Sequence, residues 1–135
     1  MARILIVDDS PSQLLGMKRI VEKLGHEIVT AEDGASGVEV AKATLPDLIL
    51  MDVVMPNLNG FQATRAISKE PTTASIPVVL VTTKDQETDK VWGMRQGAKA
   101  YITKPLTEKQ LIAEINSLLD PSRTSLVSLR KSYLK

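Results

Sequence analysis

Four short runs of apolar residues, unbroken by polar ones, constrain the fold of this chain more than any other feature. Residues 4–7, 48–51, 78–81 and 100–102 form these runs. Apolar runs of this length that are rich in β-branched residues are typical of strands buried on both faces, as in a parallel sheet. A fifth segment, residues 27–31, alternates apolar and polar residues and predicts an edge strand.

A helical pattern follows each of these segments. The first predicted helix begins at Ser10-Pro11, carries Met17 and Val21 on its apolar face and ends at Gly25. The other helices are expected to begin at Asp33, Asn59, Asp85 and Thr107, and to end by Pro46, Pro71, Gly97 and Pro121. This alternation predicts an α/β fold, a doubly wound three-layer sandwich around a five-stranded parallel sheet in the order 2-1-3-4-5. Methionines expected to fill its core are Met17, Met51, Met55 and Met94.

Three carboxylates are expected at the edge of this sheet where ligands bind. Doubly wound sheets bind ligands outside the carboxyl ends of the strands, where the strand order reverses between strands 1 and 3. Asp8 and Asp9 follow the first strand, and Asp52 follows the third. Carboxylates in one crevice repel one another unless a cation lies among them, and Mg²⁺ prefers such oxygen ligands. The pattern predicts a magnesium site, and the alternative is three surface aspartates at helix starts.

Polar groups also end the fourth and fifth strands. Thr82 ends the fourth strand, and Lys104-Pro105 follows the fifth. A hydroxyl donor and an ammonium suit an anionic ligand beside a metal ion. Taken singly, Thr82 is typical of a helix cap, Lys104 of a solvated lysine and Pro105 of a turn. A cis peptide bond before Pro105 would direct Lys104 back into the crevice.

Together these motifs resemble a response-regulator receiver domain of the CheY type over residues 2–119. The matching motifs are residues 4–10, residues 47–52, Met55-Pro56, Asn59-Gly60, Thr82 and Lys104-Pro105. Residues 60–65 and 82–93 are further similar to the small regulators of type IV pilus twitching motility. The order and spacing of the motifs, rather than any one of them, make the resemblance specific.

The resemblance implies a phosphoacceptor and a metal site. Asp52 would take a phosphoryl group from a phosphohistidine of a CheA-like sensor histidine kinase. Mg²⁺ would be bound by Asp8, Asp9, Asp52 and the backbone carbonyl of Val54. Lys104 would pair with the phosphoryl oxygens.

The resemblance also implies a switch and an output surface. Thr82 and Tyr101 would move inward on phosphorylation, although Tyr101 also suits a packing residue of a buried strand. The fourth helix, fifth strand and fifth helix would then bind a downstream protein. The implied function is a stand-alone response regulator of a two-component phosphorelay that controls pilus-based motility or taxis. It would be no enzyme beyond its own phosphorylation and dephosphorylation. The alternative is a receiver-like interaction module that is not regulated by phosphorylation.

Two other activities on this kind of fold fit the residues poorly. A flavodoxin-like nucleotide carrier needs amides and hydroxyls around a phosphate after the first strand, where Asp8 and Asp9 would repel it. A phosphatase of the haloacid dehalogenase type needs an acid two residues after its nucleophile, and Ser10 stands two residues after Asp8.

Composition excludes several further classes of function. The 17 basic and 16 acidic residues give a net charge of +1, so no nucleic-acid or membrane partner is predicted. The absence of cysteine excludes thiol nucleophiles and disulfides, and a single histidine cannot build a histidine-rich metal site. No apolar run approaches the roughly 18 residues of a membrane span, and a cytoplasmic monomer is expected.

The chain is expected to divide into a receiver domain, residues 1–120, and a basic C-terminal tail, residues 121–135. Within the tail, Leu126, Leu129, Tyr133 and Leu134 recur near helical spacing beside basic residues. A flexible tail and a short amphipathic helix that docks on a partner or an acidic surface both fit this pattern.

Overall fold

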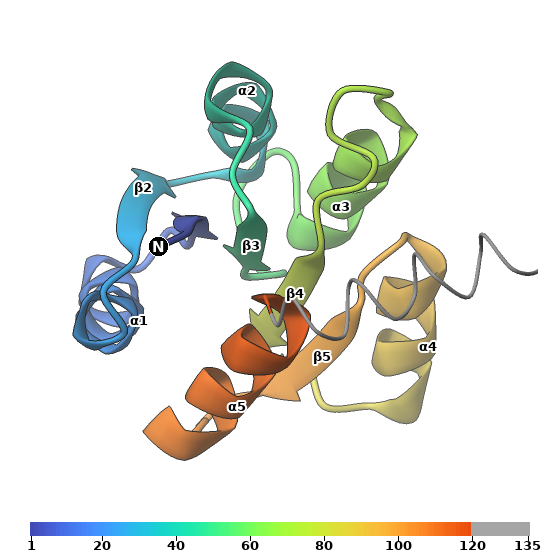
Figure 1. Ribbon diagram of the computed structural model, residues 1–135. Coiled ribbons are helices and arrows are strands. Elements are labelled where there is room, and N and C mark those ends of the chain that lie inside the picture. Colours follow the sequence, from blue (N-terminus) through green and yellow to red (C-terminus); the bar gives the residue numbers. More distant parts are fainter. Residues whose placement is uncertain (120–135) are drawn as a thin grey trace, which may run out of the picture.

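The structure is a computed structural model that describes residues 1–119. The basic tail expected over residues 121–135 therefore lies outside the described residues. Within the described part of the chain, five strands form one parallel sheet with helices on both of its faces (Figure 1).

Strands and helices alternate along the whole described chain. The strands are β1 (Arg3–Val7), β2 (Glu27–Ala31), β3 (Leu48–Met51), β4 (Val78–Thr82) and β5 (Ala100–Thr103). The helices are α1 (Pro11–Lys23), α2 (Gly34–Thr44), α3 (Gly60–Lys69), α4 (Glu87–Arg95) and α5 (Glu108–Leu119). The strand order β2-β1-β3-β4-β5 confirms the predicted doubly wound sheet, with the alternating strand β2 at one edge.

The sheet separates two apolar layers, because successive residues of a strand point to opposite faces. Ile4 and Ile6 of β1 belong to the layer beneath α1 and α5, whereas Leu5 and Val7 belong to the layer beneath α2 and α3. Figure 1 shows α1 and α5 on one side of the sheet and α2, α3 and α4 on the other. Burial on both faces explains the unbroken apolar runs, since each fully buried side chain of this size contributes about 1.5–3 kcal/mol. Three of the predicted core methionines are buried: Met17, Met51 and Met55.

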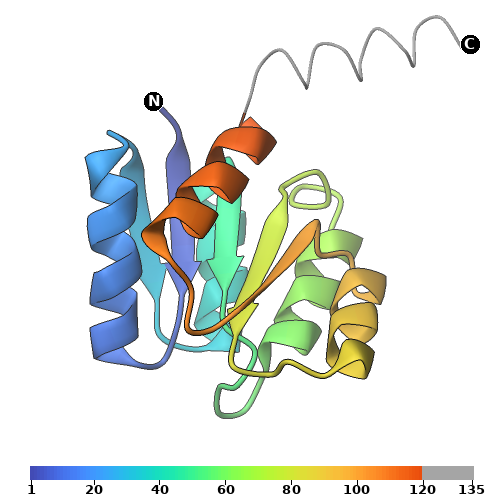
Figure 2. The same cartoon turned by 90° about the horizontal axis from the view of Figure 1, so that it is seen from below.

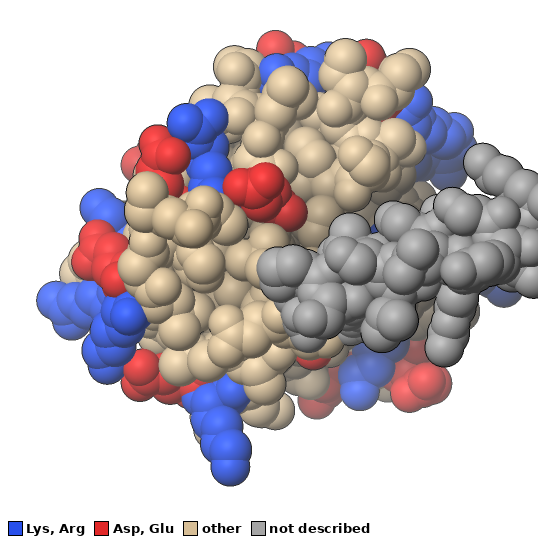
Figure 3. Space-filling view, in the orientation of Figure 1, with Lys and Arg blue, Asp and Glu red and all other residues tan. Residues whose placement is uncertain are grey.

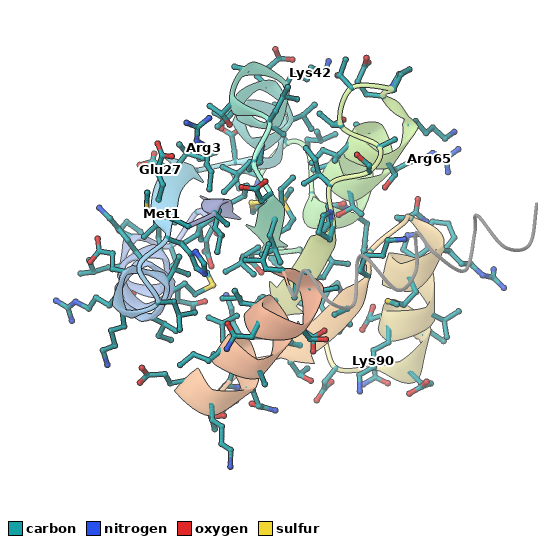
Figure 4. All side chains as sticks on the ribbon, in the orientation of Figure 1. Met1, Arg3, Glu27, Lys42, Arg65 and Lys90 are labelled. Carbon is teal, nitrogen blue, oxygen red and sulfur yellow. The ribbon has the colours of Figure 1, made fainter. Side chains whose placement is uncertain are left out.

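The amino ends of β1 and β2 are joined by polar contacts of Arg3 (Figure 4). The Arg3 guanidinium donates to the Glu27 carboxylate at 3.1 Å and to the backbone carbonyl of Thr44 at 2.8 Å. The backbone N–H of Arg3 donates to the Asp47 carboxylate at 2.8 Å. These contacts tie β1 to β2 and to the connection between α2 and β3, at the edge of the sheet opposite the carboxyl ends of the strands.

Most predicted helix starts are confirmed by their capping contacts. Side-chain oxygens accept a backbone N–H three residues later at Asp33, Asn59 and Thr107. The exception is α4, which begins at Glu87 rather than at Asp85. There Gln86 takes the cap position, and its backbone N–H donates to the Asp89 carboxylate at 3.3 Å.

The larger apolar residues of α4 face solvent, contrary to prediction. Val91 and Met94 are each 46% exposed, so the prediction that Met94 fills the core is wrong. Gly93 faces the sheet instead, and a Cβ atom added to it would lie 2.7 Å from Cδ1 of Leu80 and 3.1 Å from the ring of Tyr101. Because α4 touches the sheet through a glycine, the helix lies too close to accommodate a larger side chain on that face.

Gly60 produces a similarly close contact at the start of α3. A Cβ atom added to Gly60 would overlap the carbonyl oxygen of Asp52 and lie 2.7 Å from Cα of Val53. We expect Gly60→Ala to lower the free energy of unfolding by about 1–3 kcal/mol through overpacking. At Gly16 of α1 an added Cβ meets no atom within 4 Å. Gly16→Ala should therefore raise the free energy of unfolding by up to about 1 kcal/mol. Urea denaturation measures both changes, and equal midpoints for the two variants would show that the close approach at Gly60 does not limit side-chain size.

Candidate functional site

Three carboxylates meet where β1 and β3 end. The sheet register pairs Val7 with Met51, so the next residues along the two strands, Asp8 and Asp52, emerge side by side. The backbone N–H of Asp52 donates to the carbonyl of Val7 at 2.9 Å and fixes this arrangement. One oxygen from each of Asp8, Asp9 and Asp52 lies within 4.8 Å of the others. The predicted carboxylate cluster is therefore present, at the edge of the sheet that is lowest in Figure 2.

The three carboxylates differ in their surroundings. Asp8 and Asp52 are buried, whereas Asp9 is exposed. Asp8 accepts the backbone N–H of Ser10 at 2.9 Å, and Asp52 accepts the backbone N–H of Val53 at 2.8 Å. Two fixed carboxylates and one exposed one offer only oxygen donors, the type that suits a hard divalent cation with water ligands on its open side. The residues present thus fit a Mg²⁺ ion.

Lys104 brings a positive charge into this crevice from the end of β5. Its Nζ atom donates to Oδ2 of Asp8 at 3.0 Å and lies 3.9 Å from Oδ1 of Asp52. The backbone N–H of Lys104 donates to the carbonyl of Thr82 at 2.8 Å. The Lys104-Pro105 peptide bond is cis, one of the two forms considered from the sequence.

The pKa of the Asp52 carboxyl group lies above its ordinary value, chiefly because burial disfavours the charged form. The Lys104 ammonium opposes this shift, and the Asp8 carboxylate adds to it. Hydrogen bonds from the backbone N–H groups of Val53 and Val54 also lower the pKa. A cation between Asp52 and Asp8 would relieve the repulsion and stabilise the ionised form of Asp52.

The two predicted switch residues both bond to the backbone of Lys84, on either side of its Cα atom. Thr82 is fully buried, and its hydroxyl oxygen accepts the backbone N–H of Lys84 at 3.3 Å. The Tyr101 hydroxyl donates to the backbone carbonyl of Lys84 at 2.7 Å. Burial, followed by the charges of Asp89, Asp85 and Asp52, raises the pKa of Tyr101 to about 12, so the hydroxyl remains a donor at neutral pH.

The structure adds contacts that the sequence did not indicate. Gln13 of α1 accepts a hydrogen bond from the Lys104 ammonium through its side-chain carbonyl oxygen. The Lys84 ammonium lies 3.8 Å from the Asp89 carboxylate at the start of α4. No spacing signal could reveal the first contact, because its partners are 91 residues apart in the chain. Val54, expected to offer its carbonyl to the metal, is 56% exposed.

The distribution of charge on the surface is consistent with the net charge of +1. On the face shown in Figure 3, basic and acidic side chains lie next to one another, and neither sign covers a large region. Among the described residues, no helix is both long and apolar enough to cross a membrane.

Comparison with known proteins places this geometry in a family. The family model for the response regulator receiver domain matches residues 4–116. The chain belongs to the response-regulator receiver family. Protein PilH of Pseudomonas aeruginosa is 57% identical to it over 119 residues, which cover 88% of this chain and 98% of PilH. The resemblance found in the sequence, to the receiver family and to a small pilus regulator, is confirmed.

Two solved structures are similar to the fold of this chain. The chemotaxis protein CheY4 of Vibrio cholerae aligns with a TM-score of 0.83 at 29% identity, over 88% of this chain and 99% of CheY4. The receiver domain of the sensor histidine kinase PA1611 from Pseudomonas aeruginosa aligns with a TM-score of 0.81 at 26% identity, over 87% of this chain and 96% of that domain. The structure of the PA1611 domain has a magnesium ion coordinated in its active site cleft.

The raised pKa of Asp52 predicts a pH-dependent stability in the metal-free protein. Folding destabilises the ionised carboxylate, so Asp52→Asn should raise the free energy of unfolding at neutral pH. Because the folded-state pKa is raised, wild type loses stability relative to the variant as the pH rises from the ordinary value of 3.8 through the folded-state value. Below both values Asp52 is protonated in either state, and the difference should shrink.

Asp33→Asn provides a control of opposite sign. Hydrogen bonds from Ser36, first from its backbone N–H, lower the pKa of Asp33. Asp33 therefore stabilises the folded state above its unfolded pKa, and Asp33→Asn should be destabilising at neutral pH and less so in acid. Denaturant titrations with a chelator, from about pH 3 to about pH 7, measure both variants. The same pH trend in the two variants would contradict the assignment.

Proposed function

We propose that this receiver domain works as a stand-alone response regulator, which accepts a phosphoryl group on Asp52 from a phosphohistidine of a CheA-like sensor kinase. The observation that carries the proposal is the placement of Asp52 within 4.8 Å of Asp8 and Asp9, with the Lys104 ammonium 3.9 Å away. The proposed receiver unit spans residues 1–120, which includes the 4–116 match to the family.

Phosphoryl transfer needs charge neutralisation and in-line positioning more than it needs acid–base groups. A carboxylate oxygen of Asp52 attacks the phosphorus atom, and an oxygen–phosphorus bond forms. The nitrogen–phosphorus bond of the phosphohistidine breaks, and its electron pair returns to the imidazole nitrogen. Lys104 neutralises a phosphoryl oxygen, and no general base is required because Asp52 attacks in its ionised form.

Asp8, Asp9, Asp52 and the backbone carbonyl of Val54 would hold Mg²⁺ in this crevice. When bound, the ion would neutralise the carboxylates and the phosphoryl oxygens together. The oxygen-only donor set and the magnesium ion in the similar PA1611 domain support this assignment. On this proposal the chain is a signalling protein that catalyses only its own phosphorylation and dephosphorylation.

The output is proposed to run through Thr82, Tyr101 and the face formed by α4, β5 and α5. Thr82 and Tyr101 both bond to the backbone of Lys84, so a shift of Thr82 toward a phosphoryl oxygen would also move the partner of the Tyr101 hydroxyl. The exposed apolar residues of α4, among them Trp92, suit a protein partner on that face. Similarity to PilH supports pilus-based motility or taxis as the process controlled. We further propose that the protein acts as a monomer in the cytoplasm.

Phosphorylation tests this proposal directly. Incubated with Mg²⁺ and acetyl phosphate, wild-type protein should gain the mass of one phosphoryl group, and Asp52→Asn should gain none. Asp33→Asn, whose carboxylate caps α2 outside the crevice, should be phosphorylated like wild type. Mass spectrometry with and without a chelator measures the gain. Wild type that stays unmodified would instead favour an interaction module that is not regulated by phosphorylation.

The lifetime of the phosphorylated state is set by the access of water to the acyl phosphate. Val54 follows the acceptor by two residues, and its backbone N–H is among the groups that lower the pKa of Asp52. Its apolar side chain can neither bind nor orient water. The Lys84 ammonium, which could cover the phosphoryl group, is instead drawn toward Asp89 at 3.8 Å. We therefore expect self-dephosphorylation to be slow, because the Val54 side chain limits the access of water to the phosphoryl group.

Val54→Asn should accelerate dephosphorylation about tenfold, which corresponds to about 1.4 kcal/mol, because an amide can hydrogen-bond the attacking water. The matched control is Val91→Asn, the same substitution at an exposed position on α4. Decay of the phosphorylated protein after removal of the donor, at equal Mg²⁺ concentration, measures the rates. Equal decay in Val54→Asn and wild type would show that water access at this position does not limit hydrolysis.

A further inference from the structure

Gln13 lies on the exposed face of α1 and reaches the ammonium of Lys104 from the other side of the crevice. Its side-chain carbonyl oxygen accepts a hydrogen bond from Lys104 Nζ. The same Nζ atom donates to Oδ2 of Asp8 at 3.0 Å and lies 3.9 Å from Oδ1 of Asp52. Lys104 is thus held by two partners on separate elements, one charged and one neutral.

An ammonium group has three N–H donors, and their directions are fixed relative to one another. With one donor on Asp8 and one on Gln13, the third is left for an oxygen near Asp52, where a phosphoryl group would form. Gln13 performs this orientation without adding a negative charge, so it does not compete with a phosphoryl oxygen for the ammonium. A carboxylate at the same position would compete.

The surroundings of Lys104 show why a second partner matters. Besides the acidic crevice, Lys104 lines a mostly apolar cavity of about 520 Å³ between α1 and the loop after β5. Gln13 and Gly16 line this cavity from α1, and Pro105 and Leu106 line it from the loop. An ammonium held only by Asp8 could turn toward this open space, because the side chain has four rotatable bonds. Gln13 blocks that movement from the α1 side.

We propose that Gln13 is a positioning residue, which holds the Lys104 ammonium in the direction of the phosphoryl group and so sets the affinity of the site for phosphoryl oxygens. This inference rests on the proposed phosphoacceptor function of Asp52. Among the described residues, the hydrogen bonds of Gln13 outside the backbone ladder of α1 go to Ser10 and Lys104 and not to Asp52 or the expected metal ligands, so its effect passes through Lys104.

Two substitutions at Gln13 separate orientation from charge. Gln13→Leu removes the hydrogen bond at similar size, and it should weaken binding of beryllofluoride, a mimic of the phosphoryl group, by about three- to tenfold. Its affinity for Mg²⁺ alone should remain that of wild type. Gln13→Glu places a carboxylate on Lys104 beside the metal site, so it should bind Mg²⁺ more tightly and beryllofluoride more weakly than wild type. A merely structural role for Gln13 would not produce opposite changes in these two affinities.

The control is Gly16→Ala, which lies one turn further along α1 in the same cavity and has open space around its added Cβ atom. It should leave both affinities unchanged. Calorimetric titration with Mg²⁺, then with beryllofluoride at saturating Mg²⁺, measures all four proteins.

Wild-type affinity for beryllofluoride in Gln13→Leu would overturn the positioning role while the proposed function stands. Parallel losses of Mg²⁺ and beryllofluoride affinity in both Gln13 variants would overturn it as well, since they indicate general damage to the site. Wild-type protein that binds Mg²⁺ but no beryllofluoride would overturn the proposed function, and the role of Gln13 with it.

Discussion

The positive charge of Lys104 is the feature on which the acidic crevice depends. Its ammonium stands 3.0 Å from Asp8 and 3.9 Å from Asp52, and its side chain is only 11% exposed. Charges at such a site are screened less than surface charges, so two buried carboxylates side by side need a cation to balance them. The end of β5, the backbone bond to Thr82 and the contact with Gln13 all position this charge. They therefore determine the electrostatics of the crevice as much as the carboxylates do.

The apolar interior supports this polar edge by fixing where each strand ends. Every residue of β3 is buried, and so is every residue of β1 after Arg3, so a slip of either strand by one position would move each side chain into the opposite apolar layer and draw a polar end residue into the interior. The parallel register between them places Asp8 and Asp52 at the same level. A close contact through Gly60 holds α3 at this edge, and one through Gly93 holds α4 against β4 and β5. The sheet thus fixes the relative positions of the side chains on which the proposed phosphoryl transfer depends.

Much of this arrangement follows from sequence because it rests on repeated local signals. Strand runs, helix caps and turn residues predicted the sheet order, and carboxylates at two strand ends then had to converge on one crevice. The orientation of α4 did not follow, because the apolar residues Val91 and Met94 suggest an inner face, whereas Gly93 makes the actual contact. The Gln13–Lys104 bond could not follow either, because it joins elements that meet only in the folded chain.

The contacts at Lys84 have a consequence for how this molecule tolerates change. Thr82 and Tyr101 bind the N–H and the carbonyl of residue 84, two groups that almost every amino acid supplies in the same place. Proline alone lacks the first of them. The side chain at position 84 can consequently vary without breaking the link between Thr82 and Tyr101. Such a change would affect only the ion pair of Lys84 with Asp89. Because the link uses only main-chain atoms of residue 84, it can persist when that residue is replaced. The type of amino acid at this position therefore does not reveal the link.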